Sequence, residues 1–135
     1  MWIIDTGPLV ALLVGDDRSH AWAVEQSKEA PPFVFTCEAV ISEALFLLKR
    51  DGHEAGDLFG LVDVGFLRVD LDFHTEYVRV RELMRRYRDR PMSYADACLV
   101  RMAELHQGAT VWTLDRDFQF YRMHRRQALT LRAPW

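Results

Sequence analysis

Apolar and turn-forming positions alternate along the chain in a pattern that predicts strands separated by helices. Short apolar runs that end at polar or turn residues predict strands. The predicted strands are Trp2–Asp5, Phe33–Phe35, Phe66–Leu71, Thr110–Leu114 and Ala128–Leu131. Because helices are expected between them, these strands should pair in parallel through right-handed crossovers. The pattern predicts one α/β domain over residues 1–135, with three layers in which helices flank a mainly parallel sheet.

The helical segments are predicted from apolar positions that recur every three or four residues. They are a short helix after Pro8, His20–Glu29 capped by Ser19, Glu38–Arg50, a weaker helix through Leu58 and Leu61, an arginine-rich helix ending near Arg90, Tyr94–Leu105 and a helical turn at Phe118–Tyr121. The segment Tyr94–Leu105 is apolar almost all round, which predicts a helix packed on more than one side.

Charge is distributed unevenly along the chain. The net charge is −3, but residues 1–78 hold 5 basic and 14 acidic side chains, and residues 79–135 hold 12 basic and 6 acidic ones. The first part therefore carries −9 and the second +6. Two arginine-rich clusters, within Arg79–Arg90 and Arg116–Arg126, suit either a phosphate-binding surface or solvated helix faces.

Several classes of protein are disfavoured by what the sequence lacks. No run approaches the roughly 18 apolar residues of a membrane span, and the N-terminus has no basic region typical of an export signal. Cys37 and Cys98 form no metal-binding pattern, which fits a reduced, cytoplasmic protein. The sequence contains no HExxH, P-loop or GxSxG motif, so zinc, Walker-type and serine chemistry are not expected.

Four acidic residues lie at the ends of apolar segments or within them: Asp5, Glu43, Asp96 and Asp115. Ligands of parallel α/β folds gather at the carboxyl ends of the strands, where Asp5 and Asp115 are expected. A predicted helix carries Asp96 in its first turn, and another carries Glu43 about two turns in. The four can therefore converge. In apolar surroundings a carboxylate costs free energy unless a cation or hydrogen-bond donors satisfy it, and a divalent metal meets that need.

Each acid also has a purely structural interpretation. Asp5 could cap the helix that Pro8 begins, which is worth about 0.5–2 kcal/mol. Asp96 completes a capping-box pattern with Ser93, and Asp115 stands in a polar turn. Glu43 gains little structurally in an apolar part of its helix, so a functional role is slightly favoured there.

Taken together, the acidic segments resemble the PIN domain, and more closely the VapC-type toxin ribonucleases of prokaryotic toxin–antitoxin pairs. The likeness runs the full length of the chain and depends on the order and spacing of the segments. The matching pieces are Ile3–Leu9, Ile41–Ala44, Ser93–Ala97 and Thr113–Phe118.

The resemblance implies a metal-dependent endoribonuclease that hydrolyses RNA phosphodiester bonds with one or two Mg²⁺ or Mn²⁺ ions. Carboxylates and water are the ligands that these ions prefer. The implied metal ligands are Asp5, Glu43, Asp96 and Asp115, with Asp117 as the other possible fourth acid, while Thr6 and Thr113 would hold carboxylates or water. A homodimer and a cognate antitoxin protein are implied as well.

Two other functions remain open from the sequence. The same fold could serve an RNA-processing or DNA-directed nuclease with a different substrate. Alternatively, the chain could be a non-catalytic RNA- or partner-binding module that uses Arg79 to Arg90 on phosphates and keeps its acids for structure.

Overall fold

A five-stranded parallel sheet forms the centre of the structure, a computed structural model that describes residues 1–135. Its strands are β1 (Trp2–Ile4), β2 (Val34–Thr36), β3 (Leu67–Val69), β4 (Thr110–Trp112) and β7 (Thr130–Arg132), in the order β3-β2-β1-β4-β7. The central strands β1 and β4 bury Ile3, Ile4 and Val111 completely, as expected for strands covered on both faces. The remaining strands, β5 (Arg122–Met123) and β6 (Gln127–Ala128), form a separate antiparallel hairpin.

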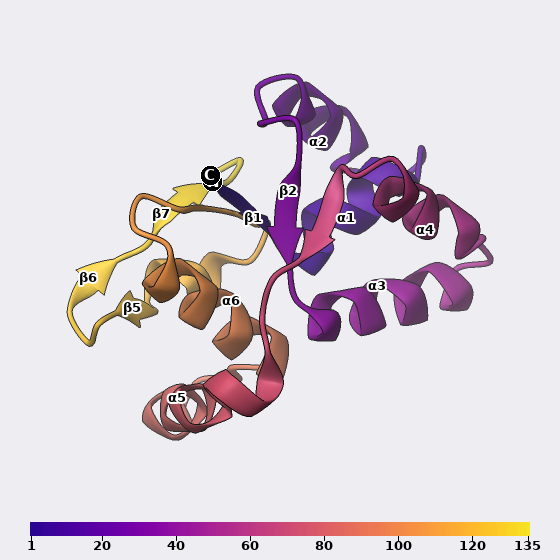
Figure 1. Cartoon of the computed structure of the whole chain (residues 1–135). Coiled ribbons are helices and arrows are strands. Elements are labelled where there is room, and N and C mark those ends of the chain that lie inside the picture. The colour runs from indigo at the N-terminus through magenta and orange to yellow at the C-terminus, as the bar shows by residue number, and fades with distance from the viewer.

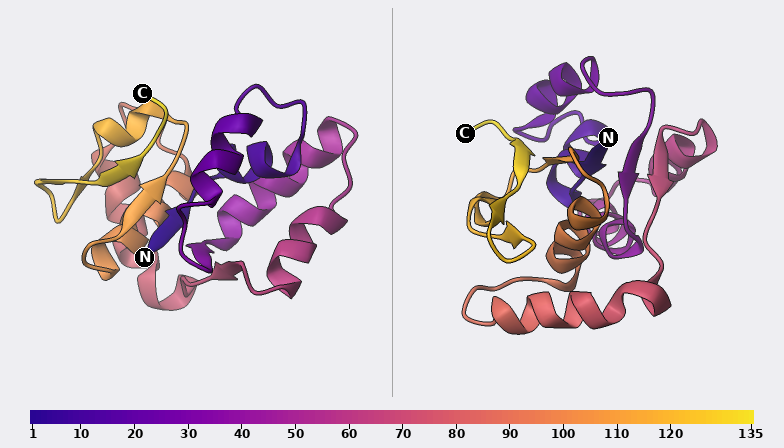
Figure 2. Two further views of the ribbon diagram at one scale, coloured as in Figure 1. Left: turned by 90° about the horizontal axis from the view of Figure 1, so that it is seen from above. Right: turned by 60° about the vertical axis from the view of Figure 1, so that its left-hand side comes forward.

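Six helices flank this sheet (Figure 1). They are α1 (Thr6–Leu13), α2 (His20–Ser27), α3 (Glu38–Arg50), α4 (Gly56–Asp63), α5 (Phe73–Arg86) and α6 (Tyr94–Leu105). The chain moves outward from β1 to β3 through α1–α4 and returns to β4 through α5 and α6, so right-handed crossovers place the two groups on opposite faces. The ribbon views show α5 and α6 on one side of the strands and α2–α4 on the other (Figures 1 and 2). The predicted parallel α/β architecture is confirmed.

Helix α6 spans the residues that its sequence pattern predicts. It packs against α5, α3 and the strands β1 and β4, and its buried residues occur all round the helix. A helix surrounded in this way needs apolar side chains on several faces, which explains why Tyr94–Leu105 lacks a clear polar stripe.

The C-terminal strand prediction is wrong in its bounds. The structure divides the predicted strand Ala128–Leu131 between β6 and β7. In the turn before β6, His124 and Arg125 adopt left-handed backbone conformations, with φ of 47° and 72°. Residues other than glycine rarely do so. Two distant side chains hold the turn: Glu104 accepts from the His124 amide at 2.7 Å, and Arg86 donates to the Arg125 carbonyl at 2.6 Å.

Helix α2 begins at His20 as predicted, but the predicted cap of α2 and the predicted start of α1 differ from the structure. The Ser19 side chain makes no capping hydrogen bond, and its amide instead donates to Asp17 at 2.8 Å. Helix α1 begins at Thr6, before Pro8. Proline is tolerated there because the amides of the first helical turn have no partner within the helix.

The helices are all too short or too polar for a membrane span.

Candidate active site

A single open cavity of about 470 Å³ brings the four predicted acids together. Asp5 follows β1 and Asp115 lies just beyond β4, and these neighbouring parallel strands pair in register at Ile4 and Trp112. Their carboxyl ends therefore meet at one edge of the sheet. The other lining residues are Thr6, Gly7, Glu43, Leu47, Pro91, Ser93, Asp96 and Leu114. The acids come from four separate segments and share no secondary-structure element.

Threonine hydroxyls hold two of the carboxylates. Thr113 donates to Asp5 at 2.6 Å, and Thr6 donates to Glu43 at 2.8 Å. Asp5 also accepts from the Thr6 amide at 2.7 Å and thereby caps α1. The Thr113 hydroxyl in turn accepts from the Asp115 amide at 2.9 Å. One network therefore joins the ends of β1 and β4 to helix α3.

Asp96 is held by the capping box that its sequence pattern predicts. Its carboxylate accepts from the Ser93 amide at 3.2 Å, and its own amide donates to the Ser93 hydroxyl at 3.0 Å. The buried Tyr121 hydroxyl also donates to the Asp96 carboxylate, at 3.2 Å. The structural interpretations of Asp5 and Asp96 as helix caps are confirmed, and both residues nevertheless line the acidic cavity. Capping and a role in the cavity are therefore compatible.

Tyr121 is a residue of this site that sequence reasoning missed. It lies 25 positions from Asp96, at the end of a predicted helical turn, and no spacing rule connects the two. Burial raises its pKa, as do the nearby charge of Asp96 and the hydrogen bond to it. The hydroxyl therefore stays protonated as a donor. A tyrosine in an apolar segment is the only sequence signal, since buried hydroxyls need a partner.

Gly7 is a second contributor that the acidic pattern did not single out. A Cβ atom at this position would lie 3.1–3.3 Å from side-chain atoms of Leu114. Glycine therefore allows the first turn of α1 to approach the chain that leads from β4 to Asp115.

The fourth acid of the cavity is Asp115. Asp117 does not line the cavity, and the Arg90 guanidinium lies 3.8 Å from its carboxylate. Asp115 accepts from the Asp117 amide at 2.9 Å, which begins the short 3₁₀ helix η1 (Arg116–Gln119). The local chain thus directs the two neighbouring carboxylates to different surroundings.

Electrostatics in the cavity disfavour a fully charged set of acids. Burial raises the pKa of Asp5 to about 7, the hydrogen bonds from Thr113 and Thr6 oppose this rise, and the charges of Asp96 and Asp115 add to it. The pKa of Asp96 is raised too, chiefly by burial. A cation among these carboxylates would reverse the shifts because it favours the charged forms.

The side-chain atoms that could bind a metal in this cavity are all oxygen atoms. Such a ligand set fits Mg²⁺ or Mn²⁺ better than zinc, which is usually bound by Cys and His. No three carboxylates stand close enough together to form a complete metal-binding group. Their hydrogen bonds to threonine, serine and tyrosine hydroxyls and backbone amides satisfy them individually. The donor set fits a hard divalent ion in its chemistry, and ion binding would have to draw the carboxylates closer.

We expect Asp5 to make stability fall as pH rises. Its carboxyl has a pKa of about 7 when folded and 3.8 otherwise, so between about pH 4 and 7 the folded state keeps a proton that the unfolded state releases. The free energy of unfolding therefore falls by about 4 kcal/mol in total once the pH is above 7. Urea unfolding from pH 4 to pH 8 should show a clearly steeper fall in stability for the wild type than for Asp5→Asn, in which only the smaller contribution of Asp96 remains.

A matched control for this prediction is Asp63→Asn, which neutralises an exposed carboxylate at the end of α4. It should keep the wild-type slope. A slope that persists unchanged in Asp5→Asn would mean that Asp5 has an ordinary pKa.

The family model of the PIN domain matches residues 2–124. The chain belongs to the PIN domain family. Among solved structures, this PIN domain is similar to VapC20 from Mycobacterium tuberculosis, described as a sarcin–ricin loop cleaving toxin. The TM-score is 0.75 and the identity 24%, over 87% of this chain and 92% of VapC20. At that identity the likeness supports the fold. No curated protein sequence matches this PIN domain.

Proposed function

We propose that this PIN domain is a metal-dependent endoribonuclease of the VapC type, the toxin of a type II toxin–antitoxin pair. The observation that carries the proposal is the convergence of Asp5, Glu43, Asp96 and Asp115 from four separate segments on one cavity. Helix capping explains Asp5, Asp96 and Asp115 singly, but it does not explain why the three face the same space together with Glu43. The family membership and the fold of VapC20 support the same activity.

The four carboxylates would hold Mg²⁺ or Mn²⁺, which when bound activates water and stabilises charge on the scissile phosphate. The protein's own contribution is to position these ligands. Thr113 holds Asp5 and Thr6 holds Glu43, while the Tyr121 hydroxyl and the Ser93 amide both donate to Oδ2 of Asp96. Fixed hydrogen bonds of this kind limit how far each carboxylate can turn away from the substrate.

A basic surface formed by α5 and the β5–β6 hairpin suits a nucleic-acid substrate. The hydrogen bond from Arg86 to the Arg125 carbonyl joins the end of α5 to the β5–β6 hairpin, so the two arginine clusters adjoin. The side chains of Arg85, Arg125 and Arg126 are exposed and make no hydrogen bond or ion pair within the chain. They are therefore available to phosphates.

Two other arginines of the first cluster have partners within the protein. Arg79 pairs with the buried Glu104 at 2.7 Å, and Arg90 lies over the Phe120 ring at 3.7 Å and near Asp117. Arg79 and Arg90 are therefore less available to phosphates than Arg85 is. Part of the cluster is structural.

The test of the proposed activity is cleavage of total cellular RNA by the purified protein with Mg²⁺, with Mn²⁺ and with EDTA. Fragments that require a metal support the proposal. Comparing single-stranded RNA, structured RNA and DNA separates it from an RNA-processing or DNA-directed nuclease. RNA binding with steep salt dependence but no cleavage with either metal would instead indicate a non-catalytic binding module.

We propose that the antitoxin binds an apolar groove of about 380 Å³ between α3 and α4. The groove is lined by Ile41, Leu45, Leu58, Phe59, Val62 and Val69, with Glu38 and Ser42 at its polar end. Phe59 and Val62 are about half exposed, so a partner would gain apolar contact there. An amphipathic helix in a hydrophobic groove is a common form of peptide recognition.

We expect Phe59→Ala to weaken antitoxin binding by at least about tenfold, since buried aromatic anchors dominate such interfaces. Binding of the co-purified antitoxin would be measured by calorimetry. Phe46→Ala is the matched control, because Phe46 is 65% exposed on α3 but does not line the groove. Equal affinities of the two variants would place the antitoxin elsewhere.

The family resemblance also leads us to propose a cytoplasmic homodimer. Light scattering on the purified protein would give its mass in solution, and a monomer at high micromolar concentration would contradict the dimer.

A further inference from the structure

A second cavity, of about 480 Å³, adjoins the acidic one. Glu43 lines both cavities, and the neighbours Ala95 and Asp96 line one each. The other residues of the second cavity are Cys37, Glu38, Ala39, Ser42, Leu71, Phe73, Tyr94 and Cys98. An RNA strand that places a phosphate at the acidic cavity would therefore have its next nucleotide beside this second cavity.

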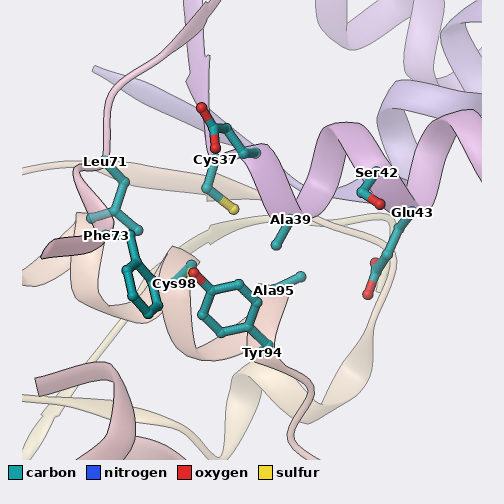
Figure 3. Close-up of a pocket in the computed structure, with 10 residues that line it drawn as sticks. Cys37, Ala39, Ser42, Glu43, Leu71, Phe73, Tyr94, Ala95 and Cys98 are labelled. Carbon is teal, nitrogen blue, oxygen red and sulfur yellow. The ribbon is translucent and has the colours of Figure 1, made fainter. Parts of the chain in front are cut away.

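Two aromatic rings form one side of the second cavity. Figure 3 shows the rings of Phe73 and Tyr94 beside each other, with Glu43 at the opposite end of the space. Their centroids are 6.4 Å apart and the planes are inclined at 71°. Phe73 is 53% exposed and Tyr94 is 40% exposed. Large rings left open beside a polar site are suited to a flat, partly apolar ligand.

The remaining wall combines apolar atoms with hydrogen-bonding groups. Leu71, Ala39 and the buried free thiols of Cys37 and Cys98 supply apolar or weakly polar surface. Glu38 and Ser42 supply oxygen atoms that can accept hydrogen bonds from amino or imino groups. Stacking surface beside a few acceptors is the chemistry by which proteins bind unpaired nucleobases.

We propose that the second cavity binds an unpaired nucleobase of the RNA, next to the phosphate that lies at the acidic cavity. The base stacks on Phe73, the more exposed of the two rings, and the cavity gives the enzyme a preference for the base at that position. This inference rests on the proposed ribonuclease function. It adds a binding site for single-stranded RNA that the acids alone do not supply.

A structural role for the same rings makes a different prediction. Phe73 stacks on Tyr77 with centroids 5.6 Å apart and planes at 23°, so this aromatic cluster also fixes the start of α5 against α6. If that were its sole role, truncation would lower stability but leave base recognition unchanged. The decisive measurement must therefore report on the base itself.

The first test uses single-stranded RNA carrying the fluorescent base 2-aminopurine, bound to Asp96→Asn protein with Mn²⁺ so that the RNA stays intact. Stacking on an aromatic ring should quench the fluorescence at one position of the RNA. Introducing Phe73→Ala into the Asp96→Asn protein should abolish that quenching. It should also weaken RNA binding by about 5- to 150-fold, since stacking contributes about 1–3 kcal/mol per base. Phe46→Ala, on the exposed side of α3 and outside both cavities, should change neither value.

Phe73→Leu keeps the apolar volume but removes the ring, so it decides the question if Phe73→Ala fails to fold. Tyr94→Phe should retain the quenching because it keeps the ring. If the quenching is unchanged both in Phe73→Leu and in Tyr94→Leu, the proposed base site is wrong.

The second test maps cleavage sites in RNA of random sequence. The wild type should show a base preference at one position beside the cut, and Phe73→Leu should flatten that preference while cutting continues. If the wild type cuts and both tests show no difference between variants, the base site alone is wrong. If the wild type never cuts, the ribonuclease function is wrong, and the fluorescence test still decides the base site.

Discussion

Replacing Asp96 with Asn is expected to lower the rate of metal-dependent RNA cleavage by at least about 100-fold while the fold remains intact. Groups that merely orient metal ligands contribute about 10- to 100-fold, and loss of a ligand should cost more. Asp96 lines the acidic cavity in the first turn of α6. The measurement is the single-turnover rate on an RNA that the wild type cleaves, with Mn²⁺ present.

The fold should tolerate this change because an amide oxygen can accept the hydrogen bonds that the carboxylate accepts now. Those bonds come from the Ser93 amide and the Tyr121 hydroxyl. Burial already raises the pKa of Asp96, so removing its charge also removes a desolvation cost. Thermal unfolding without metal should therefore change little.

Comparison of neighbouring acids sharpens the prediction. Asp115→Asn should cause a loss similar to that of Asp96→Asn, while Asp117→Asn should retain most of the activity because Asp117 lies outside the cavity. Asp63→Asn is the control for loss of one negative charge elsewhere on the surface. Full cleavage by Asp96→Asn would exclude the acidic cavity as the catalytic site, and a large loss only in Asp117→Asn would reassign the fourth acid.

Replacing Glu104 with Ala is expected to destabilise the protein by about 3 kcal/mol or more, because it removes the buried partner of Arg79 and leaves the His124 amide without its acceptor. The Glu104 carboxylate is buried and accepts from Arg79 at 3.0 and 2.7 Å, from Arg101 at 3.3 Å and from the His124 amide at 2.7 Å. It therefore ties α6 to α5 and to the turn of the β5–β6 hairpin. Urea unfolding at pH 7 measures the loss.

Glu82→Ala is a matched control for this network. Glu82 also pairs with Arg79, at 3.3 Å, but its side chain is 52% exposed whereas that of Glu104 is 1% exposed. Exposed ion pairs contribute about 0–1 kcal/mol, so this variant should be close to wild type. If the two variants were equally stable, the buried network would contribute no more than a surface pair.

The Glu104 network should also depend on pH. Burial alone would raise the pKa of Glu104, but the hydrogen bonds from Arg79 and the His124 amide outweigh this and lower it. Because the folded pKa lies below the usual pKa of 4.5 for a glutamate, the stability that Glu104 provides is present above that pH. It is lost as the pH falls through the lower, folded pKa. The difference in unfolding free energy between wild type and Glu104→Ala should therefore shrink in acid.

The hairpin before β7 illustrates why part of the fold escaped sequence reasoning. Local pattern predicted one strand at Ala128–Leu131, but two residues with positive φ create a turn upstream and the strand is divided. Arg125 is not a usual residue at such angles, whereas histidine adopts them more often than most residues do. Contacts from Glu104 and Arg86, which lie on other helices, hold them there. Such contacts have no local signature.

The order of the sheet strands and the six helices, the bounds of α6, the capping box at Ser93 and the candidate acids can all be read from the sequence, because each follows from the spacing of nearby side chains. Apolar periodicity and caps act over one or two turns, so they can be read along the chain.

The tertiary structure fixes which of these residues meet, because their spacing along the chain does not. Parallel pairing of β1 with β4 brings Asp5 and Asp115 to one edge, and Tyr121 reaches Asp96 across 25 positions. The tertiary structure also places Asp115 and Asp117 in different surroundings, pairs Arg79 with Glu104, and forms the aromatic cavity beside Glu43. These relations depend on contacts between residues far apart in the chain, which are fixed when the helices pack on the sheet.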